Sequence, residues 1–196
     1  KYLSLGAYGD GVDFFSFKGS VETLLRELRI TNVKFEACTD NASYHPGRCA
    51  CVYAGETLLG VFGQIHPLVA ANYGVDSEIY TAELSFEAMY EMRGGIPVYQ
   101  PLPKFPAVTR DIAVVCDEAV TIGALEESIR RGAKGLLKEV SLFDIYRGPG
   151  VADGKKSVAF NLVLRADDRS LTGDEADEDV QSILAALSAD HGAVLR

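Results

Sequence analysis

The sequence has no tryptophan, only four cysteines, and no apolar run near the ~20 residues that a membrane-spanning helix needs. No signal peptide is visible at its start. Basic residues are also scarce, because 19 Lys and Arg stand against 28 Asp and Glu and give a formal net charge of −9. The chain therefore lacks the basic surplus that is typical of proteins held to nucleic acid by charge.

The cysteines give little sign of metal or redox chemistry. Cys38, Cys49, Cys51 and Cys116 have no C-x-x-C spacing and no nearby pair of histidines. Cys49 and Cys51 are two residues apart in an expected strand, so they share a face. We expect reduced, partly buried thiols in a cytoplasmic protein, with chelation or redox work as the alternative.

The sequence contains no nucleophile elbow, phosphate-binding loop or paired-carboxylate arrangement. His45 and His66 each precede a proline and lack a carboxylate cluster, so we expect each imidazole to hold a turn rather than bind a metal. Arg48 predicts a buried ion pair that organises a loop, with phosphate or carboxylate binding as the alternative. Gly60 and Gly63 predict a strand that another backbone approaches closely.

Proline and glycine divide the chain. Residues 93–107 are rich in both, which predicts a semi-stiff connector between domains at 1–92 and 108–196. The first domain is expected to be mixed, with a helix at 17–28, strands around 33–37, 48–53, 57–65 and 78–84, and a short helix at 67–71.

The second domain holds three segments with the two-residue period of half-buried strands, at residues 110–116, 142–148 and 154–165. In the middle segment this period places Phe143 and Ile145 on the buried face. It places Leu142, Asp144 and Tyr146 on the open face. One side of the expected sheet is therefore apolar, and the other carries small and polar side chains.

Two helices and a last strand complete this domain. Thr121 can cap a helix that ends near Gly132, and Thr172 with Glu175 forms a capping box for a second helix. A short strand is expected at 193–196. The order of elements predicts an α+β fold, a ferredoxin-like (RRM-like) βαββαβ domain with both helices on one face. The other face is left open, as in sheet-surface RNA-binding domains.

Several short motifs occur in a fixed order along essentially the whole chain. They are Asp13-Phe14-Phe15, His45-Pro46-Gly47-Arg48, residues 60–67, residues 99–106, Arg110-Asp111-Ile112-Ala113 and Leu195-Arg196. This string resembles the C-terminal part of the bacterial phenylalanyl-tRNA synthetase β subunit. The resemblance implies an N-terminally truncated, inactive class II synthetase-like (catalytic-like) domain at 1–92 and an anticodon-binding domain at 108–196. It also implies a chain that begins inside a longer subunit and ends at its natural terminus.

The same resemblance implies a function. The chain would be a non-catalytic tRNA-binding and scaffolding part of phenylalanine–tRNA ligase, with tRNA-Phe and the catalytic α subunit as partners in a heterotetramer. ATP and Mg²⁺ would act in the α subunit, so we expect no cofactor, metal or aminoacylation activity in this chain alone. It would also lack the editing domain.

Five residues are the expected contacts to the anticodon, especially to its first base: Ala113, Asp144, Tyr146, Ser157 and Arg196. Tyr146 offers a ring on which a base can stack, and the Asp144 carboxylate can accept from the N1–H and amine of guanine. Ala113 is small enough to let a base lie near the backbone. Ser157 can bond a base or sugar, and Arg196 adds a cation at the sheet edge.

Arg147, Lys155 and Lys156 are possible phosphate contacts, although a glycine-rich turn also commonly carries solvated lysines. Residues 96–196 hold 12 basic and 16 acidic residues, and five of the acids lie at 174–179. Because the helix that starts there packs behind the sheet, we expect its charge to face away from RNA. The affinity of this domain alone is then modest.

Three other interpretations stay open. Tyr146 and Asp144 can be ordinary polar residues of an edge strand. The domain can be a regulatory module that binds an amino acid, because ferredoxin-like domains also do this. It can also be an assembly scaffold whose open sheet face is covered by a protein partner. Fold alone does not choose among them.

Overall fold

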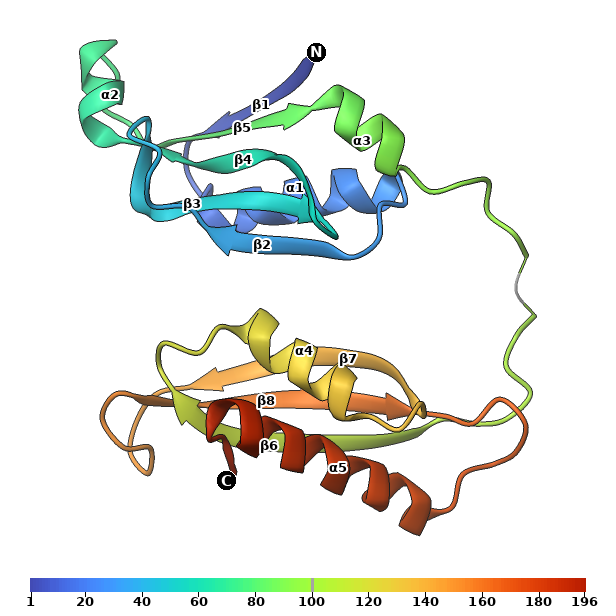
Figure 1. The fold of residues 1–196 in the computed structure, drawn as a ribbon. Coiled ribbons are helices and arrows are strands. Elements are labelled where there is room, and N and C mark those ends of the chain that lie inside the picture. The colour runs from blue at the N-terminus through green and yellow to red at the C-terminus, as the bar shows by residue number, and fades with distance from the viewer. Residues whose placement is uncertain (100) are drawn as a thin grey trace. The chain divides into compact units, whose positions relative to one another are not determined.

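The computed structural model describes residues 1–99 and 101–196, which form two compact units, Lys1–Val98 and Tyr99–Arg196 (Figure 1). The division falls inside the connector expected at 93–107. That connector includes Gln100, which lies outside the described residues. In the described part of the chain, no helix has the length and apolar character that crossing a membrane requires.

The first unit is a five-stranded antiparallel sheet with a long helix packed on one face. Its elements are β1 (Tyr2–Tyr8), α1 (Phe14–Glu27), β2 (Val33–Ala37), β3 (Tyr44–Ala54), β4 (Thr57–Ile65), α2 (Pro67–Asn72), β5 (Ile79–Ser85) and α3 (Phe86–Met92). The strand order is β1-β5-β4-β3-β2. The core lies between α1 and the sheet, where Phe17 contacts the rings of Phe62 and Tyr80.

Two elements of this unit, β1 and α3, are missing from the sequence prediction. In β1 every second side chain, starting with Leu3, packs against the core, which is the signal the prediction overlooked. Helix α1 also begins at Phe14, three residues before the predicted start, because Asp13 and Ser16 close a capping box. The Asp13 carboxylate accepts from the Ser16 amide at 2.7 Å, and the Ser16 hydroxyl accepts from the Asp13 amide at 2.8 Å.

Gly60 and Gly63 lie where the neighbouring strands leave no room for a side chain, as predicted. A Cβ at Gly60 would come within 2.0 Å of the Glu83 carbonyl oxygen. At Gly63 it would come within 2.4 Å of the Arg48 carbonyl oxygen. Both obstacles are backbone atoms of paired strands, so a small side-chain movement cannot relieve them.

The second unit has the predicted order of elements and is α+β. They are β6 (Val108–Asp117), α4 (Ile122–Gly132), β7 (Leu137–Tyr146), β8 (Lys155–Leu164), α5 (Gly173–His191) and β9 (Val194–Leu195). The sheet is antiparallel in the order β7-β8-β6-β9. Both helices lie on one side of it (Figure 1), and their buried side chains, such as Ile129 and Ile183, form a single core with the strands.

Both predicted helix starts in this unit are confirmed. The Thr121 hydroxyl accepts from the Ala124 amide at 3.2 Å at the start of α4. At the start of α5, the Thr172 hydroxyl accepts from the Glu175 amide, and the Glu175 carboxylate accepts from the Thr172 amide at 3.0 Å. This exchange is the capping box expected from the sequence.

The predicted faces are wrong at the centre of β7. Leu142 pairs with Phe160, but the next pair is Asp144 with Ala159, so Phe143 is an extra residue in a β-bulge. Directly paired residues share a face. Leu142 therefore lies on the helix-covered face with Phe160, and Phe143, predicted to be buried, is 59% exposed. A strict two-residue period cannot detect an inserted residue, whereas the residues after the bulge keep their predicted faces.

We expect Gly63→Ala to lower the free energy of unfolding of the first unit by about 3 kcal/mol, because the added methyl meets immovable backbone. Urea unfolding followed by amide resonances of each unit would measure this. The matched control is Gly19→Ala in α1, where a Cβ meets nothing within 4 Å. That variant should gain up to about 1 kcal/mol from helix propensity. Equal stability of the two variants would contradict the close approach.

Candidate functional site

The open face of the second sheet brings together the five residues expected to contact RNA: Ala113, Asp144, Tyr146, Ser157 and Arg196. Ala113 pairs with Ala159 on β8, which in turn pairs with Asp144 on β7. In the adjacent row Tyr146 pairs with Ser157. Such paired side chains start about 5 Å apart. Ala159, absent from the expected contacts, is thus the centre of the floor between Ala113 and Asp144.

Arg196 reaches across the sheet to Tyr146. It follows β9 at one edge of the sheet, yet its Cζ atom lies 4.9 Å from the centre of the Tyr146 ring at the other edge. The small side chains of Ala113 and Ala159 leave space for this contact. Ser157 is only 3% exposed, although it lies on the face that no described helix covers. The Ser157 hydroxyl can reach RNA only when side chains around it move.

The three possible phosphate contacts all have partners within the unit. Two side-chain nitrogens of Arg147 donate to the Glu118 carboxylate, at 3.1 and 2.7 Å. Lys155 forms an ion pair with Asp117 at 2.6 Å. Lys156 is 6% exposed and donates to the Glu118 carbonyl oxygen at 2.9 Å. A phosphate would have to compete with these contacts.

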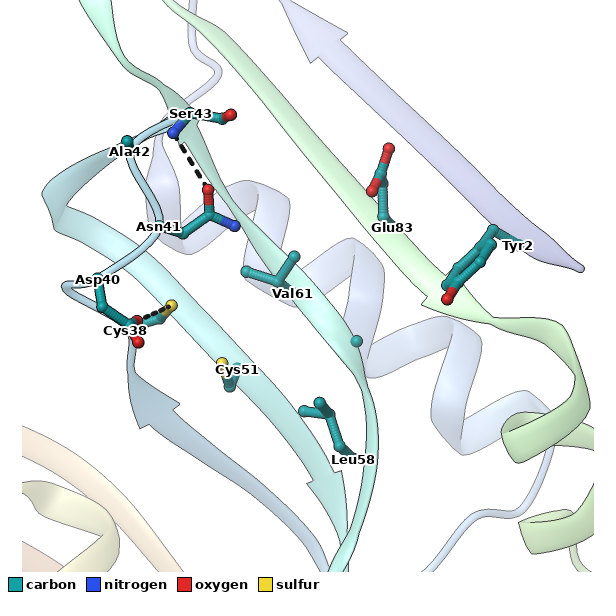
Figure 2. A pocket seen from close by; sticks show the side chains of 11 residues that line it. Tyr2, Cys38, Asp40, Asn41, Ala42, Ser43, Cys51, Leu58, Val61 and Glu83 are labelled. Atoms are coloured by element: carbon teal, nitrogen blue, oxygen red, sulfur yellow. Dashed lines mark hydrogen bonds between the residues drawn. The ribbon is translucent and has the colours of Figure 1, made fainter.

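A shallow pocket of about 600 Å³ lies on the face of the first sheet that α1 does not cover (Figure 2). Figure 2 shows the thiols of Cys38 and Cys51 and the carboxylates of Asp40 and Glu83 around it, with the Tyr2 ring at one end. None of the described residues that line it is Lys, Arg or His. The pocket therefore offers no cation to the phosphates of a nucleotide.

Two thiols of the first unit, those of Cys49 and of Cys51 beside this pocket, are poor nucleophiles. Burial and the neighbouring Cys38 thiol raise the pKa of Cys49 to about 12, and burial raises the pKa of Cys51 to about 11. Both groups are protonated at neutral pH, whereas the thiolate is the reactive form. Among the described residues, no group of three or more His, Cys, Asp or Glu is arranged to hold a metal ion.

Both imidazoles hold the local backbone, but only His66 lies at a turn, where it caps α2, whereas His45 lies inside β3, in the stretch where its pairing with β4 is irregular. The Nδ1 atom of His45 accepts from the amide two residues later at 3.0 Å, and that of His66 does the same at 3.2 Å. Arg48 forms the expected ion pair, with Glu78 at 2.9 Å, and also bonds Gln64. The pair is about half exposed, at 46% and 54%, rather than buried as predicted.

Comparison with protein families separates the same two units. Residues 103–196 match the family model of the ferredoxin-fold anticodon binding domain. Residues 1–86 match that of the phenylalanyl tRNA synthetase beta chain CLM domain. The first match covers nearly the whole second unit and the second match most of the first unit. The open sheet face described above therefore lies in the part of the chain that matches the anticodon binding domain model.

The curated relatives to which the chain is similar are phenylalanine–tRNA ligase beta subunits. The chain is 44% identical over 94% of its length to the phenylalanine–tRNA ligase beta subunit of Symbiobacterium thermophilum, and covers 20% of that protein. It is 37% identical over 99% of its length to that of Clostridium tetani, covering 24%, and 40% identical over 94% to that of Bacillus subtilis, covering 23%. The chain thus spans between a fifth and a quarter of the relatives it matches.

The contact between Arg147 and Glu118 makes a prediction about titration. Hydrogen bonds from Arg147 hold the pKa of the Glu118 carboxyl below its ordinary value. We expect Arg147→Gln to raise that pKa toward the ordinary value, as measured by carbon-detected NMR of the side-chain carboxyls. Because the folded pKa is depressed, the contact stabilises the unit at neutral pH and is lost as the pH falls through that pKa.

The matched control is Arg110→Gln, which removes a guanidinium of the same unit that pairs with Asp177. This change should leave the titration of Glu118 as it is. An unchanged Glu118 titration in Arg147→Gln would mean that Arg147 does not engage Glu118 in solution and is available to a phosphate.

Proposed function

We propose that this chain is a non-catalytic, tRNA-binding part of a phenylalanine–tRNA ligase β subunit, and that the open face of its second sheet binds the anticodon stem-loop of tRNA-Phe. The observation that carries the proposal is the arrangement of that face. An aromatic ring, a carboxylate and a cation surround a floor of small side chains. This arrangement occurs in the half of the chain that matches an anticodon-binding domain family.

Each group on the face has a role in binding a base. The Tyr146 ring takes a base by stacking, which is worth about 1–3 kcal/mol per base. Asp144 is exposed on the same face and accepts the N1–H and exocyclic amine of guanine, so it selects this base at the first anticodon position. Ala113 and Ala159 let the base lie close to the sheet.

Recognition here depends on base contacts more than on charge. The acids at 174–179 lie at the start of α5, on the side of the sheet away from the open face (Figure 1). The basic side chains expected to contact phosphate, Arg147, Lys155 and Lys156, are engaged within the unit. Lys156 also pairs with the core residue Cys116, so it lies on the helix-covered side of the sheet. The face therefore supplies specificity, and the remainder of the ligase supplies much of the affinity for tRNA.

The first unit serves as a scaffold against the catalytic α subunit of the cytoplasmic ligase. Its similarity to the CLM domain of the synthetase beta chain supports this role. The pocket on its open face lacks cations for nucleotide phosphates, which favours ATP and Mg²⁺ acting elsewhere in the ligase. An amino-acid-binding module and a scaffold without RNA contact are the other functions, and the following test separates them.

We expect fluorescent tRNA-Phe to bind the chain at low salt more tightly than a transcript altered only at the first anticodon base. Tyr146→Ala should weaken binding of the normal transcript by about 5- to 150-fold, the equivalent of one lost base stack. Asp144→Asn should bring the two transcripts close to equal affinity, because an amide donor replaces one carboxylate acceptor. Tyr73→Ala, at a tyrosine 83% exposed in the first unit, is the matched control and should bind like the unaltered chain.

Other results would choose among the alternatives. Equal binding of both transcripts, unaffected by Tyr146→Ala, would overturn anticodon recognition by this face. A rise in melting temperature with phenylalanine, without RNA binding, would favour the regulatory module. Loss of assembly with the α subunit in Tyr146→Ala, with tRNA affinity intact, would favour the scaffold.

A further inference from the structure

The turn after β7 fixes the position of the Tyr146 ring. The Tyr146 hydroxyl donates to the Pro149 carbonyl oxygen at 3.2 Å. The ring also fills the space beside Gly148, where a Cβ would come within 2.8 Å of the Tyr146 Oη atom and 2.9 Å of its Cζ atom. Two such contacts are too short to persist. Any residue larger than glycine at 148 therefore requires the ring or the turn to move.

The backbone gives no reason for glycine at this position. Gly150 and Gly154, in the same loop, have positive φ angles of 91° and 76°, which favour glycine. Gly148 is not among the glycines with positive φ, so alanine fits its backbone without strain. Among the described residues, the three atoms nearest to a Cβ at Gly148 all belong to the Tyr146 side chain.

The turn is braced, so the ring is the part that must yield. The Gly148 carbonyl oxygen accepts from the Val151 amide at 3.0 Å. Arg147 is bound to the Glu118 carboxylate, and the Glu118 amide donates to the Gly154 carbonyl oxygen at 2.8 Å. Glu118 thus holds the loop near both of its ends, at Arg147 and at Gly154. The Tyr146 ring, by contrast, is at the free end of a side chain that can change rotamer.

We infer that Gly148 is a positioning residue for Tyr146. Because it has no side chain, the ring can lie where its hydroxyl reaches Pro149 and its face meets the Arg196 guanidinium. This inference rests on the proposed function and deepens it, since it names the residue that sets the orientation of the base-stacking ring. A methyl group at 148 turns the ring out of this orientation while the fold stays intact.

The first test needs no RNA. In the 196-residue chain, the side-chain methylene protons of Arg196 are expected to show upfield NMR shifts caused by the Tyr146 ring. Gly148→Ala should move these shifts toward random-coil values and leave the melting temperature unchanged. Gly123→Ala is the matched control, because a Cβ at that position of the same unit meets nothing within 4 Å and its φ is not positive. It should keep the Arg196 shifts.

The second test measures affinity for fluorescent tRNA-Phe. We expect Gly148→Ala to weaken binding about tenfold, within the range for one lost base stack. In a Tyr146→Ala background the same change should have no further effect, because the ring that Gly148 positions is already absent. A general structural role for Gly148 would instead weaken binding by the same factor in both backgrounds.

The outcomes separate this inference from the function on which it rests. If Tyr146→Ala weakens binding but Gly148→Ala does not, or if Gly148→Ala leaves the Arg196 shifts as they were, the positioning role is overturned and anticodon binding stands. If Gly148→Ala moves the Arg196 shifts but neither variant changes RNA affinity, the proposed function is overturned, and with it a role for Gly148 in binding a base.

Discussion

The candidate site depends on the burial of one face of the second sheet beneath α4 and α5. Val114 pairs with Val158, and Ile112 pairs with Phe160, and all four side chains are buried in the core. These pairs fix the register of β6 and β8, because a slip by one residue would turn every core side chain toward solvent. The residue between them on each strand is an alanine, and the two alanines necessarily face each other on the open side. The floor of the site is therefore a consequence of the core.

The charges of the second unit limit how strongly its open face attracts RNA. The second unit carries more acids than bases, and Glu118 engages Arg147 through its carboxylate and Lys156 through its carbonyl oxygen. These contacts hold the loop after β7 against the turn that precedes α4. They also reduce the attraction for phosphate that the sequence suggests for those cations. Under the proposed function, such a face discriminates between bases better than it attracts RNA from a distance.

Much of the fold follows from local sequence signals, and the failures have specific causes. The capping box of Thr172 and Glu175 is visible in the sequence because it depends on residues three apart. The bulge at Phe143 is not, because it depends on how β7 pairs with a distant strand. The prediction for Arg48 was right about an ion pair and wrong about its burial, which depends on how the surrounding residues pack.

At the site, too, the local pattern was predictable and the contact between distant strands was not. The alternation along β7 correctly placed Asp144 and Tyr146 on the open face, since both follow the bulge. The contact between Arg196 and Tyr146 could not be predicted, because it joins the two edges of the sheet and requires the strand order to be known. This contact occupies the ring on which a base would stack. An exposed cation–π contact is worth about 0.5–1 kcal/mol, whereas a stacked base is worth about 1–3 kcal/mol. Under the proposed function, a base that stacks on Tyr146 replaces the guanidinium contact with one of equal or greater worth, so the self-contact does not close the site to RNA.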